Sequence, residues 1–296
     1  MRRIEETLSR AHLPFGYNHT SMTRFFHTGD PLTREEWERL MKTVSAVGNA
    51  TVARRFIQTT GPFGAGAQTV PSETLVGITE GYKSLQGEDG ARVIAGKRSS
   101  EIVPIISKDF VLHWRDLAEA RQTAQPLSFA KAAAAASSCA RTEDKLVFYG
   151  HSAYGYKGLM TVAGRNNLTG LQWSNAGDAF NNFTKLTQIL RSRGYNGPFA
   201  AVVHPHIYAD MHRVLEGSTL LEISHVKALL TAGIFRSSLL APRTGFVVSP
   251  GKENLDLVIS VDTSLAFLGA KQMNLPFRVF KAVYLRILRS DAICTF

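Results

Sequence analysis

The sequence predicts an α+β fold, and three stretches carry that prediction. Residues 128–149 form one uninterrupted Ala-rich segment with strong helix propensity. Residues 62–100 contain many glycines, and short runs with β-branched residues lie between them. This pattern is typical of extended strands and a long hairpin. Apolar and polar side chains alternate along residues 277–288, as expected for one long strand with a partly solvated face. A long helix beside strands of mixed length therefore defines the fold class.

The Ala-rich helix is expected to begin at Ser128, a good N-cap that follows the helix-breaking Pro126. It should end at Gly150, a natural residue just after a helix. Such a helix has about 22 residues and a length of roughly 33 Å. Residues 132–136 are all alanine and carry little bulk, so the rod can pack closely on two sides. We interpret it as an internal spine rather than a low-complexity tract.

The chain before residue 62 divides into two parts. Residues 1–30 lack periodicity and are predicted to be an N-terminal arm. Their aromatic side chains would be costly to leave in water, so packing on an adjacent subunit and a mobile tail both remain open. Residues 31–61 are predicted to form an N-terminal helix, because Thr33 and Glu36 make a capping box. Apolar side chains then follow at helical spacing: Trp37, Leu40, Met41, Val44 and Val47.

The rest of the chain mixes helices and strands. Residues 103–117 predict a strand followed by a short helix that continues through Arg121. Residues 158–248 form a mixed region, after which strands dominate. The expected helices cover 179–193, 205–215 and 223–231, and the expected strands cover 199–203, 246–249, 255–261, 266–269 and 277–288.

Composition fits an ordinary folded protein of the cytoplasm. The chain has 296 residues, 44% hydrophobic and 20% charged, without an apolar run long enough to span a membrane. Charged residues near the start, including Glu5 and Glu6, argue against a signal peptide. Cys139 and Cys294 lack metal-site spacing and are expected to be reduced structural thiols. The net charge of +10 is scattered along the chain, which does not favour a specific nucleic-acid partner.

No credible active site is found in the sequence. His204, His206 and His212 could bind a metal, but their spacing does not put two ligands on one helical face, and no carboxylate completes the site. The glycine-rich residues 61–66 lack the Lys-Ser/Thr pair of a phosphate loop. We therefore expect no catalytic residue, no metal and no cofactor, and the protein is not expected to be an enzyme.

Six segments together form a recognisable pattern. They are GPFG at 61–64, VPIISKDFVLHWRDL at 103–117, EDKLVFYG at 143–150, GYKGLM at 155–160, GYNGPF at 194–199 and the closing segment 261–296. The pattern resembles the encapsulins, specifically the family-one, linocin-like shell proteins, over about residues 31–296. The resemblance implies the tailed-phage major-capsid fold. Its parts would be an extended loop at 62–100, a peripheral domain with the spine helix at 101–157 and 249–296, and an axial domain at 158–248.

The function implied by this resemblance is structural. Many copies would close into an icosahedral shell around a cargo enzyme in the cytoplasm. In this family a short C-terminal peptide recruits the cargo, which is commonly an iron-oxidising ferritin-like protein or a peroxidase. The ending at residues 291–296 is similar to that of iron-storing systems, which favours iron storage and protection from oxidative stress. The alternative is a phage or prophage major capsid protein.

The resemblance also places a pore. In encapsulins the loop that matches residues 215–220 surrounds the five-fold axis. The residues concerned are Leu215, Glu216, Gly217, Ser218 and Thr219. A ring of carboxylates and hydroxyls would favour small cations such as Fe²⁺ over anions, whereas an ordinary helix connection is the plain alternative.

A cargo-peptide site is implied on the inner wall, between the N-terminal helix and strands near the C-terminus. The matching residues are Arg54, Ile57, Gln58, Asp262, Thr263 and Leu265. Ile57 and Leu265 would receive small apolar side chains, and Asp262 would pair with a basic residue of the peptide. Arg54 and Gln58 are expected to share a helical face and bond the peptide backbone. Gln58 stands where some relatives carry an acid, so the site is expected to be less selective for basic peptides.

Overall fold

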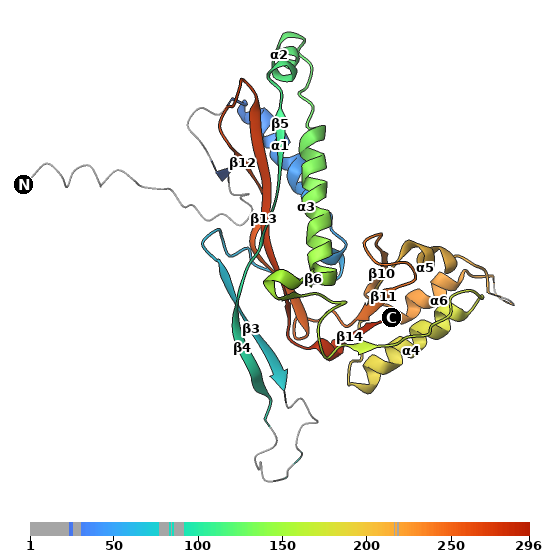
Figure 1. Cartoon of the computed structure of the whole chain (residues 1–296). Coiled ribbons are helices and arrows are strands. Elements are labelled where there is room, and N and C mark those ends of the chain that lie inside the picture. Colours follow the sequence, from blue (N-terminus) through green and yellow to red (C-terminus); the bar gives the residue numbers. More distant parts are fainter. Residues whose placement is uncertain are drawn as a thin grey trace, which may run out of the picture.

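The computed structural model describes residues 24–25, 31–76, 83, 85, 92–215, 217 and 219–296. Its longest strands pair antiparallel in a five-stranded sheet, along which the helices α1 and α3 lie (Figure 1). The members are β1 (Arg24–Phe25), β12 (Leu255–Phe267), β13 (Leu275–Ile287) and β5 (Ile105–Leu112) in that order, with β2 (Thr59–Thr60) also paired to β12. Apart from β1, the arm expected over residues 1–30 lies outside the described residues.

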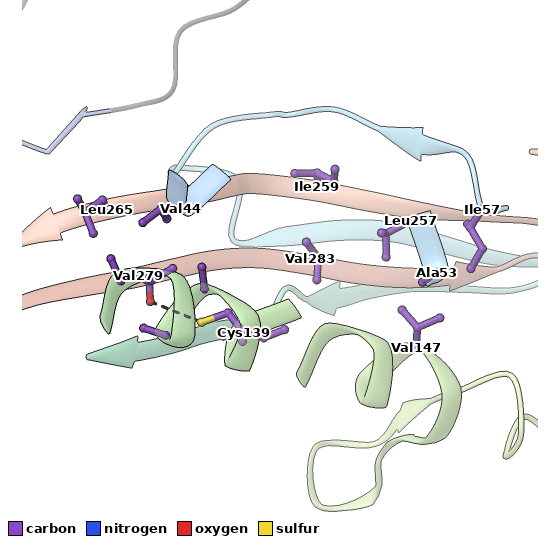
Figure 2. Packing of buried hydrophobic residues seen from close by; sticks show 14 of the residues in the cluster. Val44, Ala53, Ile57, Cys139, Val147, Leu257, Ile259, Leu265, Val279 and Val283 are labelled. Carbon is purple, nitrogen blue, oxygen red and sulfur yellow. Dashed lines mark hydrogen bonds between the residues drawn. The ribbon is translucent and has the colours of Figure 1, made fainter. Parts of the chain in front are cut away.

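The spine helix is confirmed as α3 (Ala130–Tyr149), and it begins two residues later than the sequence suggested. Phe129 occupies the N-cap position, and the Ser128 hydroxyl accepts only a long bond of 3.5 Å from the Ala130 N–H. Its small residues are buried against the sheet: Ala132, Ala135, Ala136 and Cys139. Figure 2 shows Cys139 facing Val279 of β13, with its Sγ 3.8 Å from the Val279 carbonyl oxygen. Small side chains thus let the helix approach the sheet closely.

The first helix is α1 (Arg34–Gly48), and its predicted capping box is confirmed. The Thr33 Oγ1 accepts from the Glu36 N–H at 3.2 Å, and the Glu36 carboxylate accepts from the Thr33 N–H at 2.8 Å. The prediction of a helix through residue 61 is wrong, because α1 ends at Gly48.

The chain after Gly48 is held by contacts distant in sequence. A single 3₁₀ turn, η1 (Ala53–Arg55), replaces the expected helical continuation. The N–H groups of Val52 and Ala53 both donate to the carboxylate of Asp144 on α3, each at 2.9 Å. A tertiary cap therefore overrides the local helical pattern.

The glycine-rich stretch contains an antiparallel hairpin of β3 (Thr69–Val76) and β4 (Ile94–Ile102), as the sequence predicts. It projects away from the body of the subunit (Figure 1). A small apolar cluster joins its root to the sheet: Val70, Val103, Val258, Val261 and Ala282. Among the described residues the hairpin pairs with no third strand. Beyond β5, the predicted short helix is confirmed as α2 (Trp114–Gln122).

A second sheet lies beyond the end of α3 (Figure 1). Its order is β10 (Gly233–Arg236), β9 (Ala200–Val203), β11 (Gly245–Val248), β14 (Ile293–Thr295) and β8 (Asn166–Asn167). Its helices are α4 (Asp178–Ser192), α5 (Pro205–Asp210) and α6 (Glu222–Leu229). The remaining short elements are β6 (Gly150–His151), η2 (Ser152–Tyr154), β7 (Tyr156–Lys157) and η3 (Ser290–Ala292).

Two further elements differ from expectation. The helix expected over 205–215 ends at Asp210, because the chain turns there and Val214 pairs with Leu221 in an antiparallel bridge. The strands expected at 255–261 and 266–269 are one strand, β12, whose register shifts twice between Ile259 and Ser264. Irregular pairing thus hides the continuity of a long strand. None of the helices in the described ranges is long and apolar enough to cross a membrane.

Candidate functional site

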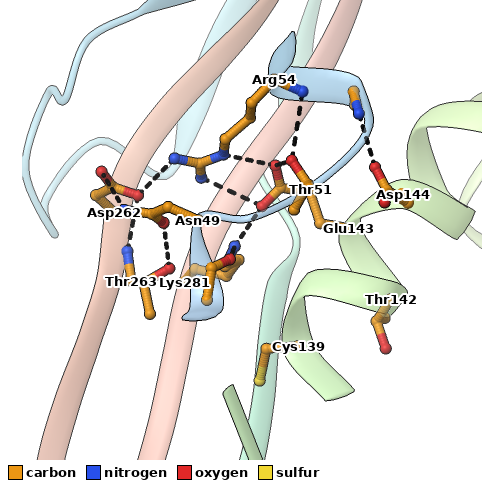
Figure 3. Close-up of polar contacts among 12 residues, drawn as sticks. Asn49, Thr51, Arg54, Cys139, Thr142, Glu143, Asp144, Asp262, Thr263 and Lys281 are labelled. Carbon is orange, nitrogen blue, oxygen red and sulfur yellow. Dashed lines mark hydrogen bonds and ion pairs between the residues drawn. The ribbon is translucent and has the colours of Figure 1, made fainter. Parts of the chain in front are cut away.

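Four charged side chains from four separate elements meet beneath the surface where α1, α3 and the large sheet join (Figure 3). We call this set the charge cluster. Its members are Arg54 of η1, Glu143 of α3, Asp262 of β12 and Lys281 of β13. Two cations and two carboxylates balance, so the charge cluster is formally neutral.

Arg54 is the bridge of the charge cluster. Its Nε and Nη2 donate to the two Glu143 oxygens at 2.7 and 3.2 Å, while its Nη1 donates to Asp262 Oδ1 at 2.9 Å. The planar guanidinium can serve both carboxylates at once, which a lysine could not do with the same geometry. Lys281 approaches Glu143 from the other side, and its Nζ also donates to the Gly48 carbonyl at 2.6 Å. The end of α1 is thereby tied to β13.

Burial and charge act against each other on these groups. Burial lowers the pKa of Lys281, and the Glu143 carboxylate opposes that change. Burial would likewise lower the pKa of Arg54, but the hydrogen bond and charge of Glu143 raise it above its ordinary value. A buried ion pair of this kind is worth little net stability, yet removing one partner is costly. The charge cluster joins η1, α3, β12 and β13 through side-chain contacts.

Asp262 is committed to this network rather than free. Besides Arg54, its Oδ1 accepts from the Thr263 N–H at 2.8 Å, and its Oδ2 is 3.4 Å from the Asn49 amide nitrogen. The Thr263 hydroxyl donates to the Asn49 side-chain oxygen at 2.6 Å. The Asp262 side chain is still 42% exposed, so its outer edge reaches the surface.

Of the six expected peptide-contacting residues, the structure joins Arg54, Asp262 and Thr263 by hydrogen bonds, whereas Ile57 and Leu265 lie at opposite ends of the packed core in Figure 2. Gln58 lies beyond η1, so the expectation that it shares a helical face with Arg54 is wrong. Ile57 and Leu265 are 2% and 0% exposed and belong to the main core, which leaves them little surface for a peptide (Figure 2). Thr263 is buried as well. Exposed surface among the six is concentrated on Gln58 and Asp262.

The sequence interpretation missed Glu143 and Lys281 as members of this region. Both left a signal. Glu143 and Asp144 are adjacent acids in a helix that is otherwise rich in alanine and buried. Lys281 takes an inward position in β13, between Val279 and Val283, where only apolar residues are expected.

A shallow depression of about 330 Å³ lies beside the charge cluster. It is lined by Asn49, Ala50, Thr51, Val52, Arg54 and Arg55. No acidic side chain is part of this lining.

The expected pore loop is described only in part. Glu216 and Ser218 lie outside the described residues, whereas Gly217 and Thr219 are exposed and Leu215 is half-buried. Arg213 anchors the base of the loop, donating to Asp210 and to the Trp173 and Ser174 carbonyls.

The three histidines act locally. The His204 Nδ1 accepts from the His206 N–H at 3.2 Å and caps α5, and the His212 Nδ1 lies 2.8 Å from the Tyr208 carbonyl. Within the part of the chain that the structure describes, no group of three or more His, Cys, Asp or Glu residues could hold a metal ion.

Comparison with known sequences gives consistent matches. A sequence model of the family described as encapsulating protein for peroxidase matches residues 22–284. The chain is 43% identical to the type 1 encapsulin shell protein EncA of Myxococcus xanthus, over 91% of this chain and 94% of that protein. It is 35% identical to a diheme-cytochrome-encapsulin shell fusion protein of Kuenenia stuttgartiensis, over 89% of this chain and 73% of that protein. A ferritin-like-encapsulin shell fusion protein of Pyrococcus furiosus is 23% identical over 70% of this chain and 55% of that protein.

Solved structures show the same architecture. A virus-like particle from Pyrococcus furiosus matches with a TM-score of 0.71 and 20% identity, covering 88% of this chain and 99% of that chain. The capsid of Myoviridae Phage XM1 matches with a TM-score of 0.62 and 13% identity, covering 83% and 90%. The α+β capsid fold expected from the sequence is therefore confirmed.

Proposed function

Because the chain belongs to the encapsulin shell-protein family, we propose that many copies of it close into an icosahedral shell that holds a cargo protein in the cytoplasm. The observation that carries the proposal is the match to a shell protein along nearly the whole chain. The role is structural: the subunit builds and lines a compartment, and the chemistry belongs to the cargo.

The β3–β4 hairpin supports assembly from many copies. A two-stranded hairpin is marginally stable alone, and its free edges can accept a strand from a neighbour. Its apolar residues Ile94 and Ile102 are 58% and 65% exposed in the single subunit. We therefore assign the hairpin to contacts between subunits, by β-addition.

The cargo we propose is an iron-oxidising, ferritin-like protein that carries a short C-terminal targeting peptide. One relative is itself a fusion with a ferritin-like domain, which supports this class. Another relative is fused to a diheme cytochrome, so cargo differs within the family. The capsid fold of a phage gives the second candidate, a prophage capsid subunit.

Purification of the native particle tests both functions. We expect closed shells in negative-stain micrographs, with a ferritin-like protein among the copurifying proteins identified by mass spectrometry. Nuclease-resistant DNA inside the particles would instead favour the prophage capsid, and the absence of closed particles would reject both.

We further propose that the cargo peptide docks at Arg54, Gln58 and Asp262. Support comes from the exposed side chain of Gln58, the 42% exposed side chain of Asp262, and Arg54, which bonds Asp262 and lines the depression. The test is coexpression of the copurifying cargo with Asp262→Lys and Ile57→Asp shells. Because Ile57 is buried, Ile57→Asp can fail to fold, so Gln58→Lys serves as the third variant. Full cargo loading into assembled Asp262→Lys and Gln58→Lys shells would refute this location.

A further inference from the structure

The charge balance of the proposed dock argues against recognition of a basic peptide residue by Asp262 alone. Arg54 and Lys281 together need two negative charges, and Glu143 supplies only one. Asp262 supplies the other through its 2.9 Å bond to Arg54 Nη1. A basic peptide residue bound at Asp262 would have to compete with Arg54 for a charge that is already in use. Asp262 is therefore a poor sole determinant of peptide binding.

The other acid nearby is also occupied. The Asp144 carboxylate faces the start of η1, where it accepts from the N–H groups of Val52 and Ala53, and the residue is 6% exposed. The backbone N–H of Arg54 is bonded to the Thr51 Oγ1 at 3.3 Å. These N–H groups are satisfied within the subunit, so an anionic ligand in the depression would need side-chain donors.

Arg55 is the charge that remains available. Its side chain is exposed and lines the depression, and it takes part in no ion pair among the described residues. Its guanidinium carbon lies 4.6 Å from the centroid of the Phe235 ring, which in turn stacks on Phe56 at 5.7 Å. Stacking limits the freedom of the guanidinium, and within the described part of the chain its N–H groups donate to no side chain or carbonyl.

We propose that Arg55 binds a carboxylate of the cargo's targeting peptide, either an acidic side chain or the terminal carboxylate. This inference rests on the proposed cargo function and names the chemistry of its dock. A preorganised guanidinium suits a carboxylate, which it can bind through two parallel hydrogen bonds. Arg54 is already paired with Glu143 and Asp262, so Arg55 supplies the unpaired positive charge of the depression, whose lining residues include no acid. Its volume of about 330 Å³ suits a short peptide segment rather than a folded domain.

The test uses a monomeric fluorescent protein that carries the last ten or so residues of the copurifying cargo. This probe is coexpressed with the shell, and loading is measured as fluorescence per shell after size exclusion. A second probe has every Asp and Glu of the tag replaced by Asn and Gln. A third has a Gly-Ser extension that moves the terminal carboxylate away, and a fourth combines both changes.

The shells are wild type, Arg55→Gln and Arg39→Gln. Arg39 is the matched control: it is exposed, stacks on Phe129 at 5.6 Å and lies outside the depression.

We expect Arg55→Gln to reduce loading of the unmodified probe about tenfold, as for loss of one charge-assisted hydrogen-bonded pair. Neutralising or moving the relevant carboxylate should cause a similar loss in wild-type shells and no further loss in Arg55→Gln shells. Arg39→Gln should load normally. If Arg55→Gln and the change to the probe's carboxylate reduced loading additively, the assignment of Arg55 would be overturned. An equal loss of loading with Arg39→Gln would overturn it as well. Either result would leave the cargo function in place. Absence of any loading into wild-type shells would overturn the peptide dock and this assignment together.

Discussion

The ammonium of Lys281 donates to the carboxylate of Glu143 at a point where both side chains are 0% exposed. Glu143→Gln would leave this lysine buried without its counterion, at a cost of about 3–5 kcal/mol in the free energy of unfolding. The double variant Glu143→Gln with Lys281→Met removes both charges and should recover most of that loss. Denaturant unfolding of both proteins measures the difference. A double variant as unstable as the single one would contradict this account of the pair.

Gly48 allows α1 to end close to β12. A Cβ built on Gly48 would lie 2.4 Å from Thr263 Cγ2 and 2.9 Å from its Oγ1. Gly48→Ala should therefore destabilise the subunit by about 1–3 kcal/mol, despite the better helix propensity of alanine. Gly66→Ala is the matched control, because a Cβ there meets nothing within 4 Å. The melting temperatures of the two variants are then compared. Equal melting temperatures would show that Thr263 and its strand shift to accommodate the added methyl group.

Asp144 gives a pH dependence with a defined sign. Burial raises its pKa above the ordinary 3.8, although bonds from Ala53 and Val52 oppose the shift. Between the ordinary pKa of the unfolded chain and the raised pKa of the folded state, the folded state binds more protons than the unfolded state. The contribution of Asp144 to stability therefore falls as pH rises. The stability difference between wild type and Asp144→Asn should therefore shrink as pH rises through that window.

Asp109 provides the opposite sign as a control for this measurement. Its hydrogen bond to Arg278 lowers its pKa, so its contribution is present above the ordinary value and is lost as pH falls. The difference between wild type and Asp109→Asn should therefore grow with rising pH, and only slightly because the pair is half exposed. Scanning calorimetry from pH 3 to 7 or so measures both trends. Slopes of the same sign in both variants would show that the assignment to Asp144 is wrong.

Deletion of residues 70–98 removes all of β3 except Thr69, together with the first five residues of β4. We expect soluble monomers or small oligomers, because the long helices and the two five-stranded sheets are kept. Light scattering after size exclusion and negative-stain microscopy report the outcome. Intact closed shells from this deletion would refute the hairpin as an assembly element.

The proposed pore depends on charge at Glu216. Glu216→Lys should slow entry of Fe²⁺ into loaded shells, because a ring of positive charge repels cations. Stopped-flow oxidation of Fe²⁺ by encapsulated cargo measures the rate. Glu119→Lys, on the exposed face of α2, is the charge-matched control. An unchanged rate in Glu216→Lys shells would remove charge selection from this loop.

Local rules predicted the elements that depend on local contacts. The capping box of Thr33 and Glu36, the spine helix and the β3–β4 hairpin all follow from residues close in sequence. The end of α1 does not, because the carboxylate that caps η1 belongs to Asp144, far along the chain. Tertiary hydrogen bonds of this kind carry no signal in a local window.

The sequence named Arg54 and Asp262, which the structure joins by an ion pair, but it did not reveal that their charges are paired. The peptide location implied by the family resemblance stays a prediction, and Ile57 and Leu265 are core residues rather than an open apolar surface. Whether Asp262 is free depends on Arg54, which is itself held by Glu143. Such a chain of contacts joins three elements, so single residues read from the sequence could not reveal which charges are already paired.

The pairing of β5 with β13 has a consequence for how a subunit forms. These neighbours in one sheet are separated in sequence by α3 and by nearly all of the second sheet. Loop closure over such a distance is slow, and it becomes easier once the intervening chain has folded into a compact unit. Until then β13 lacks its partner on one side, and β5 lacks its neighbour in the sheet, so both expose edges that other unfinished chains can bind. The order of folding within one chain thus decides whether it joins a growing shell or an aggregate.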